Sequence, residues 1–153
     1  MSNTKNLSAV TQEIRSAFHL LKTLGDALHA DTGVTTSMRG VLETLVVNGP
    51  QTVPQVAAAK SVSRQHIQQL VDPLVAAGLA ALQDNPGHKR SPIVTATRRG
   101  NDLFESMQRK EAVLFQKLAR DHNAGDLKAT LSTLSVLNKN LALIAKELTD
   151  VSS

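Results

Sequence analysis

The sequence predicts a mostly α-helical chain with one small β hairpin, an α+β fold, and three observations lead to this prediction. Apolar residues recur every three to four positions over most of the chain, which is the period of an amphipathic helix. Two short segments, residues 79–83 and 92–95, have the composition of strands. Between them, residues 84–91 are rich in turn-forming types. The length of 153 residues is that of one domain, so we place a single domain at 1–153.

A long first helix is predicted from residue 7 to about residue 30. Its apolar positions follow one another along one face: Leu7, Val10, Ile14, Ala17, Phe18, Leu21, Leu24 and Leu28. Residues 31–33 interrupt this pattern, and Thr35 is a suitable N-cap for a second helix. The stop signal Asn48-Gly49-Pro50 is expected to end that second helix.

Two shorter helices are predicted in the middle of the chain. Residues 51–53 should be extended, because the position before a proline disfavours the helical conformation. Pro54 then suits the first turn of a third helix that runs through Lys60. Ser63 is a suitable N-cap for a fourth helix, whose buried stripe consists of Ile67, Leu70, Val71 and Leu74.

The fourth helix should end at Gly78, which suits the position just beyond a helix C-terminus. Pro73 lies inside this helix and leaves one carbonyl without a partner, so a bend or a gap in hydrogen bonding is expected there. After the hairpin, Thr97 is the predicted N-cap of a long fifth helix that ends near residues 122–125. A sixth amphipathic helix continues through Leu148.

The fourth helix and the hairpin together predict a DNA-binding surface. Residues 50–100 hold six Lys and Arg against two Asp, whereas the other 102 residues hold eleven of each sign. The excess positive charge therefore lies in the segment that would meet phosphates. The helix face opposite the apolar stripe is polar, with Gln65, Gln69 and Asp72 at its centre and His66 and Gln68 on its flanks. A polar reading helix followed by a basic hairpin is the layout of a winged helix-turn-helix, which we place at residues 35–100.

Ten residues are candidate DNA contacts. Glutamine can bond bidentately to adenine, so the glutamines of the fourth helix are candidates for base edges. Arg64, at the helix N-terminus, is a candidate for a phosphate, and Lys89 and Arg90 for an adjacent minor groove. The full set is Thr35, Arg39, Ser63, Arg64, Gln65, His66, Gln68, Gln69, Lys89 and Arg90. The alternative is that these side chains only solvate a surface helix and an exposed turn.

The first helix and the last two helices carry more apolar surface than a small winged helix needs to cover. We expect a two-fold homodimer built on residues 7–31 and 101–150, because a paired reader gains both affinity and half-site spacing. An ordinary bundle within one chain is the alternative.

Composition argues against several other classes of protein. No apolar run approaches the ~20 residues that span a bilayer, and the N-terminus lacks a secretory signal, so we expect a cytoplasmic location and no membrane partner. The absence of Cys, together with the spacing of the five His, predicts no metal and no cofactor. The acidic residues are scattered over helix surfaces, so the chain is not expected to be an enzyme. With three Phe as the only aromatic residues, duplex is favoured over single-stranded nucleic acid.

The chain resembles the MarR family of winged-helix transcriptional regulators over roughly residues 7–148. The resemblance is carried by residues 49–57, by Val62 to Gln65, Leu70 to Asp72 and Gly78-Leu79, and by Ser91, Thr97 and Gly100. It implies a homodimer whose two winged helices bind double-stranded DNA at a pseudo-palindromic operator. It also implies repression that a small-molecule effector often relieves, through a pocket between the dimer helices and the winged helix. Nothing in the sequence identifies the ligand-binding residues.

Two features depart from the family pattern. The wing commonly reads Asp-Arg-Arg, whereas this chain has His88-Lys89-Arg90, so the usual brace of the tip is missing. Arg90 would then be freer to reach DNA, or the wing would be looser. The absence of Cys excludes the thiol-switch members of the family. The alternative function is a winged-helix protein interaction module without sequence-specific DNA binding.

Overall fold

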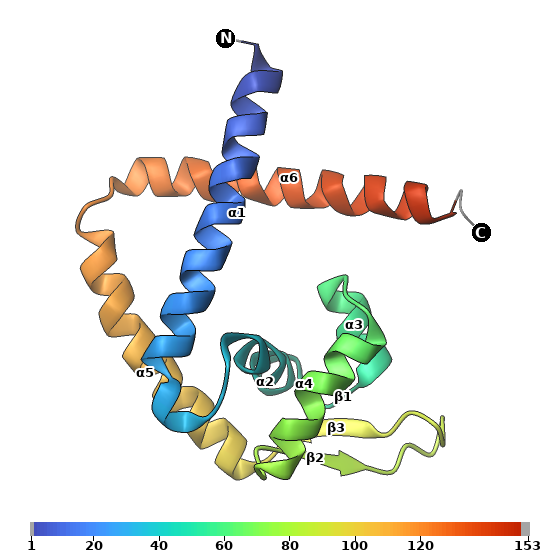
Figure 1. Cartoon of the computed structure of the whole chain (residues 1–153). Helices are drawn as coiled ribbons and strands as arrows, with labels where there is room; N and C mark the ends of the chain where they lie inside the picture. Colours follow the sequence, from blue (N-terminus) through green and yellow to red (C-terminus); the bar gives the residue numbers. More distant parts are fainter. Residues whose placement is uncertain (1, 151–153) are drawn as a thin grey trace. The chain divides into compact units, whose positions relative to one another are not determined.

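The computed structural model describes residues 2–150 (Figure 1), which form two compact units, one ending at Glu111 and the next beginning at Ala112. No helix within residues 2–150 is long and apolar enough to cross a membrane. The first unit contains, in chain order, α1 (Asn3–Leu28), η1 (Ala30–Thr32), α2 (Thr36–Asn48), β1 (Gln51–Thr52), α3 (Val53–Lys60), α4 (Arg64–Ala76), β2 (Ala80–Gln83) and β3 (Ile93–Ala96). Helix α5 (Arg98–Ala119) begins in the first unit and ends in the second, which also holds α6 (Ala124–Asp150). The predicted fold class, mostly helical with a small hairpin, is confirmed.

The junction between α1 and α2 is held by polar side chains from both helices. Thr35 caps α2 as predicted, its hydroxyl accepting from the Met38 N–H at 3.2 Å. The next residue, Thr36, donates its backbone N–H to Asp26 Oδ1 of α1 at 2.6 Å. Hydrogen bonding from Thr36, mainly from this N–H, holds the pKa of the Asp26 carboxyl below its ordinary value.

Helices α3 and α4 begin at local capping motifs. Thr52 accepts from the Gln55 N–H at 3.3 Å, while the Gln55 side chain accepts from the Thr52 N–H at 2.8 Å. This reciprocal capping box fixes the first turn of α3, in which Pro54 lies as predicted. Ser63 caps α4 by accepting from the His66 N–H at 3.1 Å, which confirms the predicted start of that helix.

The C-terminus of α4 leads directly into the sheet. Gly78 has a φ of +70°, the left-handed conformation that glycine adopts without strain, and the Leu79 N–H donates back to the Leu74 carbonyl at 2.9 Å. The predicted closure at Gly78 is thereby confirmed. Pro73 lies inside α4, which continues to Ala76, and the bend or hydrogen-bonding gap expected there stays a prediction.

The sheet has three antiparallel strands rather than the two of the predicted hairpin. Strands β2 and β3 pair from Ala80 opposite Ala96 to Gln83 opposite Ile93. The segment predicted only as extended, β1, pairs with the other edge of β3, giving the order β1-β3-β2. The end of β3 that lies nearest the turn of the hairpin is therefore joined to the segment just before α3.

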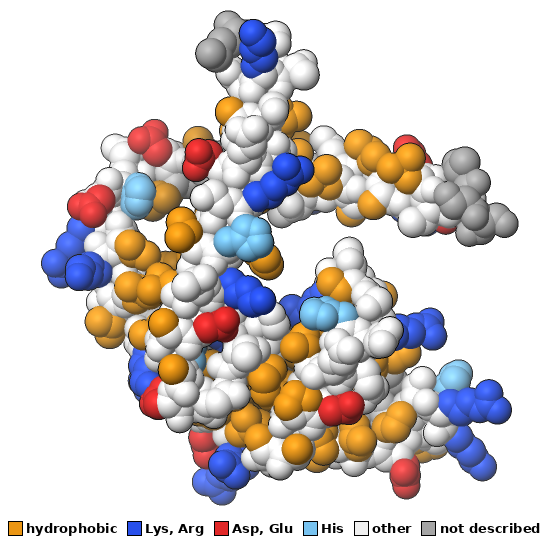
Figure 2. All heavy atoms as spheres, in the orientation of Figure 1, with side chains coloured by type: hydrophobic (Ala, Val, Ile, Leu, Met, Phe, Trp, Pro, Cys, Tyr) orange, Lys and Arg blue, Asp and Glu red, His pale blue; other side chains and the backbone are white. Residues whose placement is uncertain are grey.

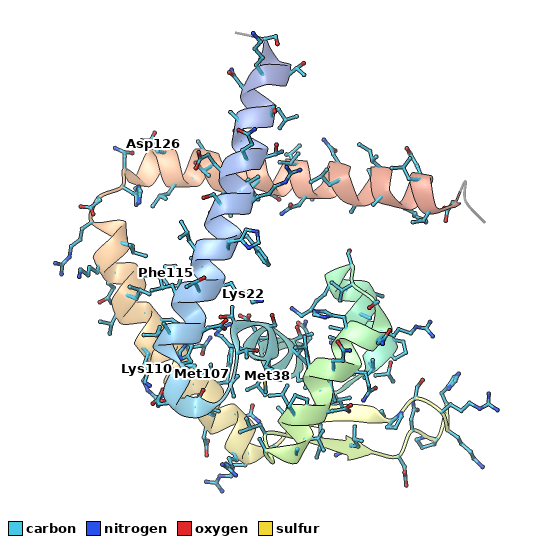
Figure 3. All side chains as sticks on the ribbon, in the orientation of Figure 1. Lys22, Met38, Met107, Lys110, Phe115 and Asp126 are labelled. Carbon is cyan, nitrogen blue, oxygen red and sulfur yellow. The ribbon has the colours of Figure 1, made fainter. Side chains whose placement is uncertain are left out.

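The core of the first unit lies between α2, α3, α4, the sheet and the N-terminal half of α5. Its fully buried side chains include Leu42, Val56, Leu74, Val94 and Phe104. Met38 of α2 and Met107 of α5 are also members of this core and are marked in Figure 3. Each such side chain stabilises the fold by about 1.5–3 kcal/mol through removal from water. Because Phe104 and Met107 belong to this core, they hold the N-terminal half of α5 to the rest of the first unit.

Further along α5, an ionic cluster links this helix to α2 and to the end of α1. Glu111 of α5 accepts from Arg39 of α2, at 2.5 Å to Nε, and lies 2.8 Å from Nε2 of the fully buried His29. The preceding residue of α5, Lys110 (Figure 3), donates to Asp31 at 3.0 Å. This hydrogen bond is the main cause that lowers the pKa of the Asp31 carboxyl.

Candidate nucleic-acid interface

Helix α4 divides into a buried stripe and an exposed polar face. Ile67, Val71 and Leu74 are buried in the core, in agreement with the predicted stripe. The predicted contacts on this helix, Ser63, Arg64, Gln65, His66, Gln68 and Gln69, are all exposed. The amphipathic period therefore identified correctly which side chains are available at the surface of α4.

A groove between α4 and the hairpin brings several of these candidates together. Arg64, Gln65 and Gln68 line its helix side, and Arg90, Ser91 and Pro92 line its hairpin side. Its apolar lining residues are Val53, Pro54, Leu82 and Val94, and its volume is about 330 Å³. Two guanidinium groups and two amides from segments far apart in the sequence thus border one concave surface.

The hairpin tip is basic and exposed. Figure 2 shows Lys, Arg and His side chains gathered at the free end of the hairpin, where His88, Lys89 and Arg90 are all exposed. A second hollow of about 310 Å³ lies beside the first and includes His88 together with Arg64. Arg64 consequently borders both hollows, between the first turn of α4 and the hairpin.

Asn85 braces the hairpin tip in place of the missing Asp-Arg pair. Its side-chain Nδ2 donates to the Ser91 carbonyl across the turn at 2.9 Å, and its Oδ1 accepts from the Gly87 N–H at 3.2 Å. The Ser91 N–H also donates to the His88 carbonyl at 3.0 Å. This brace was not predicted from the sequence, although an Asn two residues before a Gly is a known turn signal.

The two candidates on α2 lie away from this groove. The Arg39 guanidinium donates to Glu111, donates to Glu43 at 3.0 Å, and lies 5.0 Å from the centre of the Phe104 ring. Each of its three guanidinium nitrogens already donates to a carboxylate, and the side chain is only 16% exposed, so Arg39 is engaged within the first unit. Thr35 is exposed, but its hydroxyl caps α2. Neither residue lines the groove between α4 and the hairpin.

His66 faces a different surface from Gln65 and Gln68. It lines a groove of about 360 Å³ between α1, α2 and α4, together with Phe18, Leu21, Lys22, Lys60 and Leu70. Lys22, labelled in Figure 3, belongs to α1. The first turn of α4 therefore contributes to two grooves, one on the hairpin side and one on the α1 side.

Three helices packed as a helix-turn-helix, followed by a basic antiparallel hairpin beside the exposed face of the last of them, define a winged helix-turn-helix protein. In this class, α4 is the recognition helix and the hairpin is the wing.

Comparisons with known proteins identify the family. A sequence model of the MarR family matches residues 32–91. An uncharacterized protein of Mycobacterium tuberculosis is 33% identical over 115 residues, which cover 75% of this chain and 80% of that protein. The crystal structure of a MarR family transcription regulator has a TM-score of 0.81 and 26% identity, covering 94% of this chain and 95% of that one. The S. aureus MepR–DNA complex has a TM-score of 0.77 and 17% identity, with 86% and 97% covered. The chain belongs to the MarR family of transcription regulators.

Proposed function

We propose that the protein is a homodimeric repressor that binds a pseudo-palindromic DNA operator through α4 and the wing. The observation that carries the proposal is the groove in which Arg64, Gln65 and Gln68 of α4 meet Arg90 of the wing. Helix α4 is narrow enough to enter a major groove, and a basic wing beside it suits the neighbouring minor groove. The MepR structure, which has the same fold, is a complex with DNA.

The side chains of this surface divide into two kinds of contact. Arg64, at the positive end of the α4 dipole, suits a phosphate, and Lys89 and Arg90 add charge at the wing. Gln65 and Gln68, which line the groove, carry donor and acceptor groups that distinguish bases. Gln69 is exposed next to them without lining the groove. Affinity would come mainly from the basic groups and sequence preference from the amides.

Selection of duplexes from a random library with the purified protein tests the proposal. We expect enrichment of a palindrome whose half-sites are about one helical turn apart, with affinity that falls steeply between two salt concentrations. If no sequence is enriched and only weak, salt-sensitive binding is seen, the result favours a protein interaction module instead.

Arg64→Ala and Gln65→Ala are expected to weaken DNA binding in different ways. Arg64→Ala should reduce affinity for every duplex and lower the salt dependence by about one counterion, because it removes a phosphate contact. Gln65→Ala should cost about 1–3 kcal/mol, mainly on the selected site. Titration of selected and random duplexes with both variants measures the difference.

Arg109→Ala is the control, because Arg109 is 72% exposed on α5 and outside the groove. If Gln65→Ala loses affinity equally for the selected and the random duplex, Gln65 does not read a base.

The homodimer is supported by apolar faces that the described chain leaves exposed. Helix α1 has no buried residue, and its apolar face consists of Leu7, Val10, Ile14, Phe18, Leu21 and Leu24, all exposed. Helix α6 likewise has no buried residue, and its stripe includes Leu127, Leu131, Leu141, Ile144 and Leu148, all exposed. Contiguous apolar surface of this kind marks an interaction site. A second copy of the chain is the partner that a palindromic operator requires.

We propose that a small ligand relieves repression by binding in the groove between α1, α2 and α4. Its walls are largely apolar, with Phe18, Leu21 and Leu70, and its cations are Lys22 and Lys60. Its volume of about 360 Å³ is in the range of small-molecule sites. An apolar anion fits this combination, and it would contact α4 on the side away from the wing, where it can shift the recognition helix.

Benzoate is expected to weaken operator binding, whereas neutral benzyl alcohol at the same concentration should not. The reason is that the lysines of the groove attract the carboxylate, while both compounds have the same ring. Lys60→Ala should reduce the response to benzoate, measured as the ratio of operator affinities with and without it. An unchanged ratio in Lys60→Ala would contradict this assignment of the effector site.

A further inference from the structure

The amide of Gln68 is held by a carboxylate one helical turn further along α4. Gln68 Nε2 donates to Asp72 Oδ1 at 2.6 Å. An ionised carboxylate can only accept hydrogen bonds, so the NH₂ end of the amide, and not its oxygen, must face Asp72. Of the three glutamines on α4, all of them within the described residues, Gln68 is the one that has a side-chain hydrogen bond.

The position of this pair relates it to the groove between α4 and the wing. Arg64, Gln68 and Asp72 are spaced by four residues and so follow one another along one ridge of the helix. Arg64 and Gln68 line the groove, and all three side chains are exposed. Asp72 thus acts on Gln68 from its C-terminal side while Gln68 remains available to a ligand in the groove.

The held amide presents a defined pattern to a base. One N–H is taken by Asp72, which leaves Oε1 as an acceptor and the second N–H as a donor. Adenine offers the complementary pair in the major groove, a donor at N6 and an acceptor at N7. Guanine offers two acceptors, O6 and N7. A free amide could turn both hydrogens of its NH₂ group toward guanine, but an amide held by Asp72 would place Oε1 against O6.

We propose that Asp72 is a positioning residue for sequence reading, which fixes the Gln68 amide so that α4 prefers adenine over guanine at one position of each half-site. This inference rests on the proposed function, in which α4 lies in the major groove. Asp72 does not contact the base. Its negative charge also opposes binding to phosphates, so its removal has a second effect, on affinity for all DNA, that can be measured separately.

The test measures operator binding by the full-length protein, with each adenine of the selected half-site replaced in turn by guanine. In the wild type, guanine should weaken binding by at least ~5-fold at the position that Gln68 reads. Gln68→Ala identifies that position as the one where the preference disappears. Asp72→Ala should reduce the preference there to less than ~2-fold and leave the other positions unchanged. In the Gln68→Ala background, Asp72→Ala should have no further effect on the base preference.

Two further variants separate positioning from charge and from damage to the helix. Asp84→Ala removes one exposed carboxylate next to β2 without touching Gln68, so it should raise affinity for random duplex as Asp72→Ala does, but keep the adenine preference. Asp72→Asn retains the size of the side chain, but an amide can donate as well as accept, so it no longer dictates which end of Gln68 faces it. It should therefore lose the preference as Asp72→Ala does.

The outcomes distinguish this inference from the function on which it rests. A wild type that reads bases, with an Asp72→Ala variant of identical base preference, overturns the positioning role and leaves the proposed function standing. Loss of preference in Asp72→Ala at positions that Gln68→Ala does not affect also overturns it. A wild type that has no base preference at any position overturns both.

Discussion

Replacing Gly100 with alanine is expected to destabilise the protein by about 3 kcal/mol, at the upper end of the usual cost of overpacking a core. Gly100 is buried in the first turn of α5, and an added Cβ would lie 2.0 Å from the carbonyl oxygen of Leu79 and 3.3 Å from Leu42 Cδ1. The Leu79 oxygen already accepts from the Thr97 N–H at 3.0 Å. The added Cβ could be accommodated only if the Leu79 backbone moved away from α5. That movement would break the hydrogen bond between Thr97 and Leu79 and separate the wing from α5.

Urea unfolding followed by circular dichroism measures this effect as a lower midpoint concentration. Gly40→Ala is the matched control, since Gly40 also lies within a helix, α2, where an added Cβ would be 3.6 Å from Lys60 Nζ, an ordinary contact. Alanine should there raise stability by about 0.5–1 kcal/mol through helix propensity. An unfolding midpoint of Gly100→Ala equal to that of the wild type would contradict the predicted close approach of α5 to Leu79.

Leu141→Lys is expected to convert the protein to a monomer and to weaken operator binding by at least ~100-fold. Leu141 is 51% exposed and lies in the leucine stripe of α6, the face assigned to the second copy. A lysine in the middle of a buried apolar interface would leave its charge without a partner. Operator affinity would fall because the two half-sites would no longer be bound by linked modules, and linkage of this kind contributes about 10²- to 10⁴-fold.

Sedimentation of the variant gives its mass, and titration of full and half operators gives its affinities. Leu143→Lys is the control: Leu143 is in the same helix and is 63% exposed, but it lies two residues from Leu141 and so on the other side of α6. It should remain dimeric and bind the full operator normally. If Leu141→Lys sediments as a dimer, α6 does not supply the interface.

Local sequence signals were sufficient for the capped helix ends, but not for two others: α1 begins at Asn3 rather than at residue 7, and α5 ends at Ala119 rather than near residues 122–125. Thr35, Ser63 and Thr97 each accept from an N–H in the first turn of the helix they precede, as predicted from their residue types. Gly78 closes α4 in the left-handed conformation. These features depend on hydrogen bonds between residues two to five apart, so the sequence nearby contains nearly all the information.

Contacts between distant segments could not be predicted in this way. The pairing of β1 with β3 joins residues about forty positions apart, and its short length gave no periodic signal. Arg39 is one of the predicted DNA contacts, and its acceptor Glu111 is 72 residues away, so nothing near Arg39 in the sequence indicated that its guanidinium is engaged. The brace from Asn85 replaces a pair known from the family and had no counterpart in the expected pattern.

The sequence by itself determined that this chain has a capped amphipathic helix with a polar outer face, a basic hairpin after it and unused apolar faces on its long helices. Only the tertiary structure decided which flank of α4 meets the wing. The spacing of apolar residues indicates which side chains of a helix are buried, but it does not specify which other element lies beside the exposed ones. The fold places Gln68 on the wing side and His66 on the α1 side, because the core contacts of Ile67, Val71 and Leu74 fix the rotation of α4 about its axis.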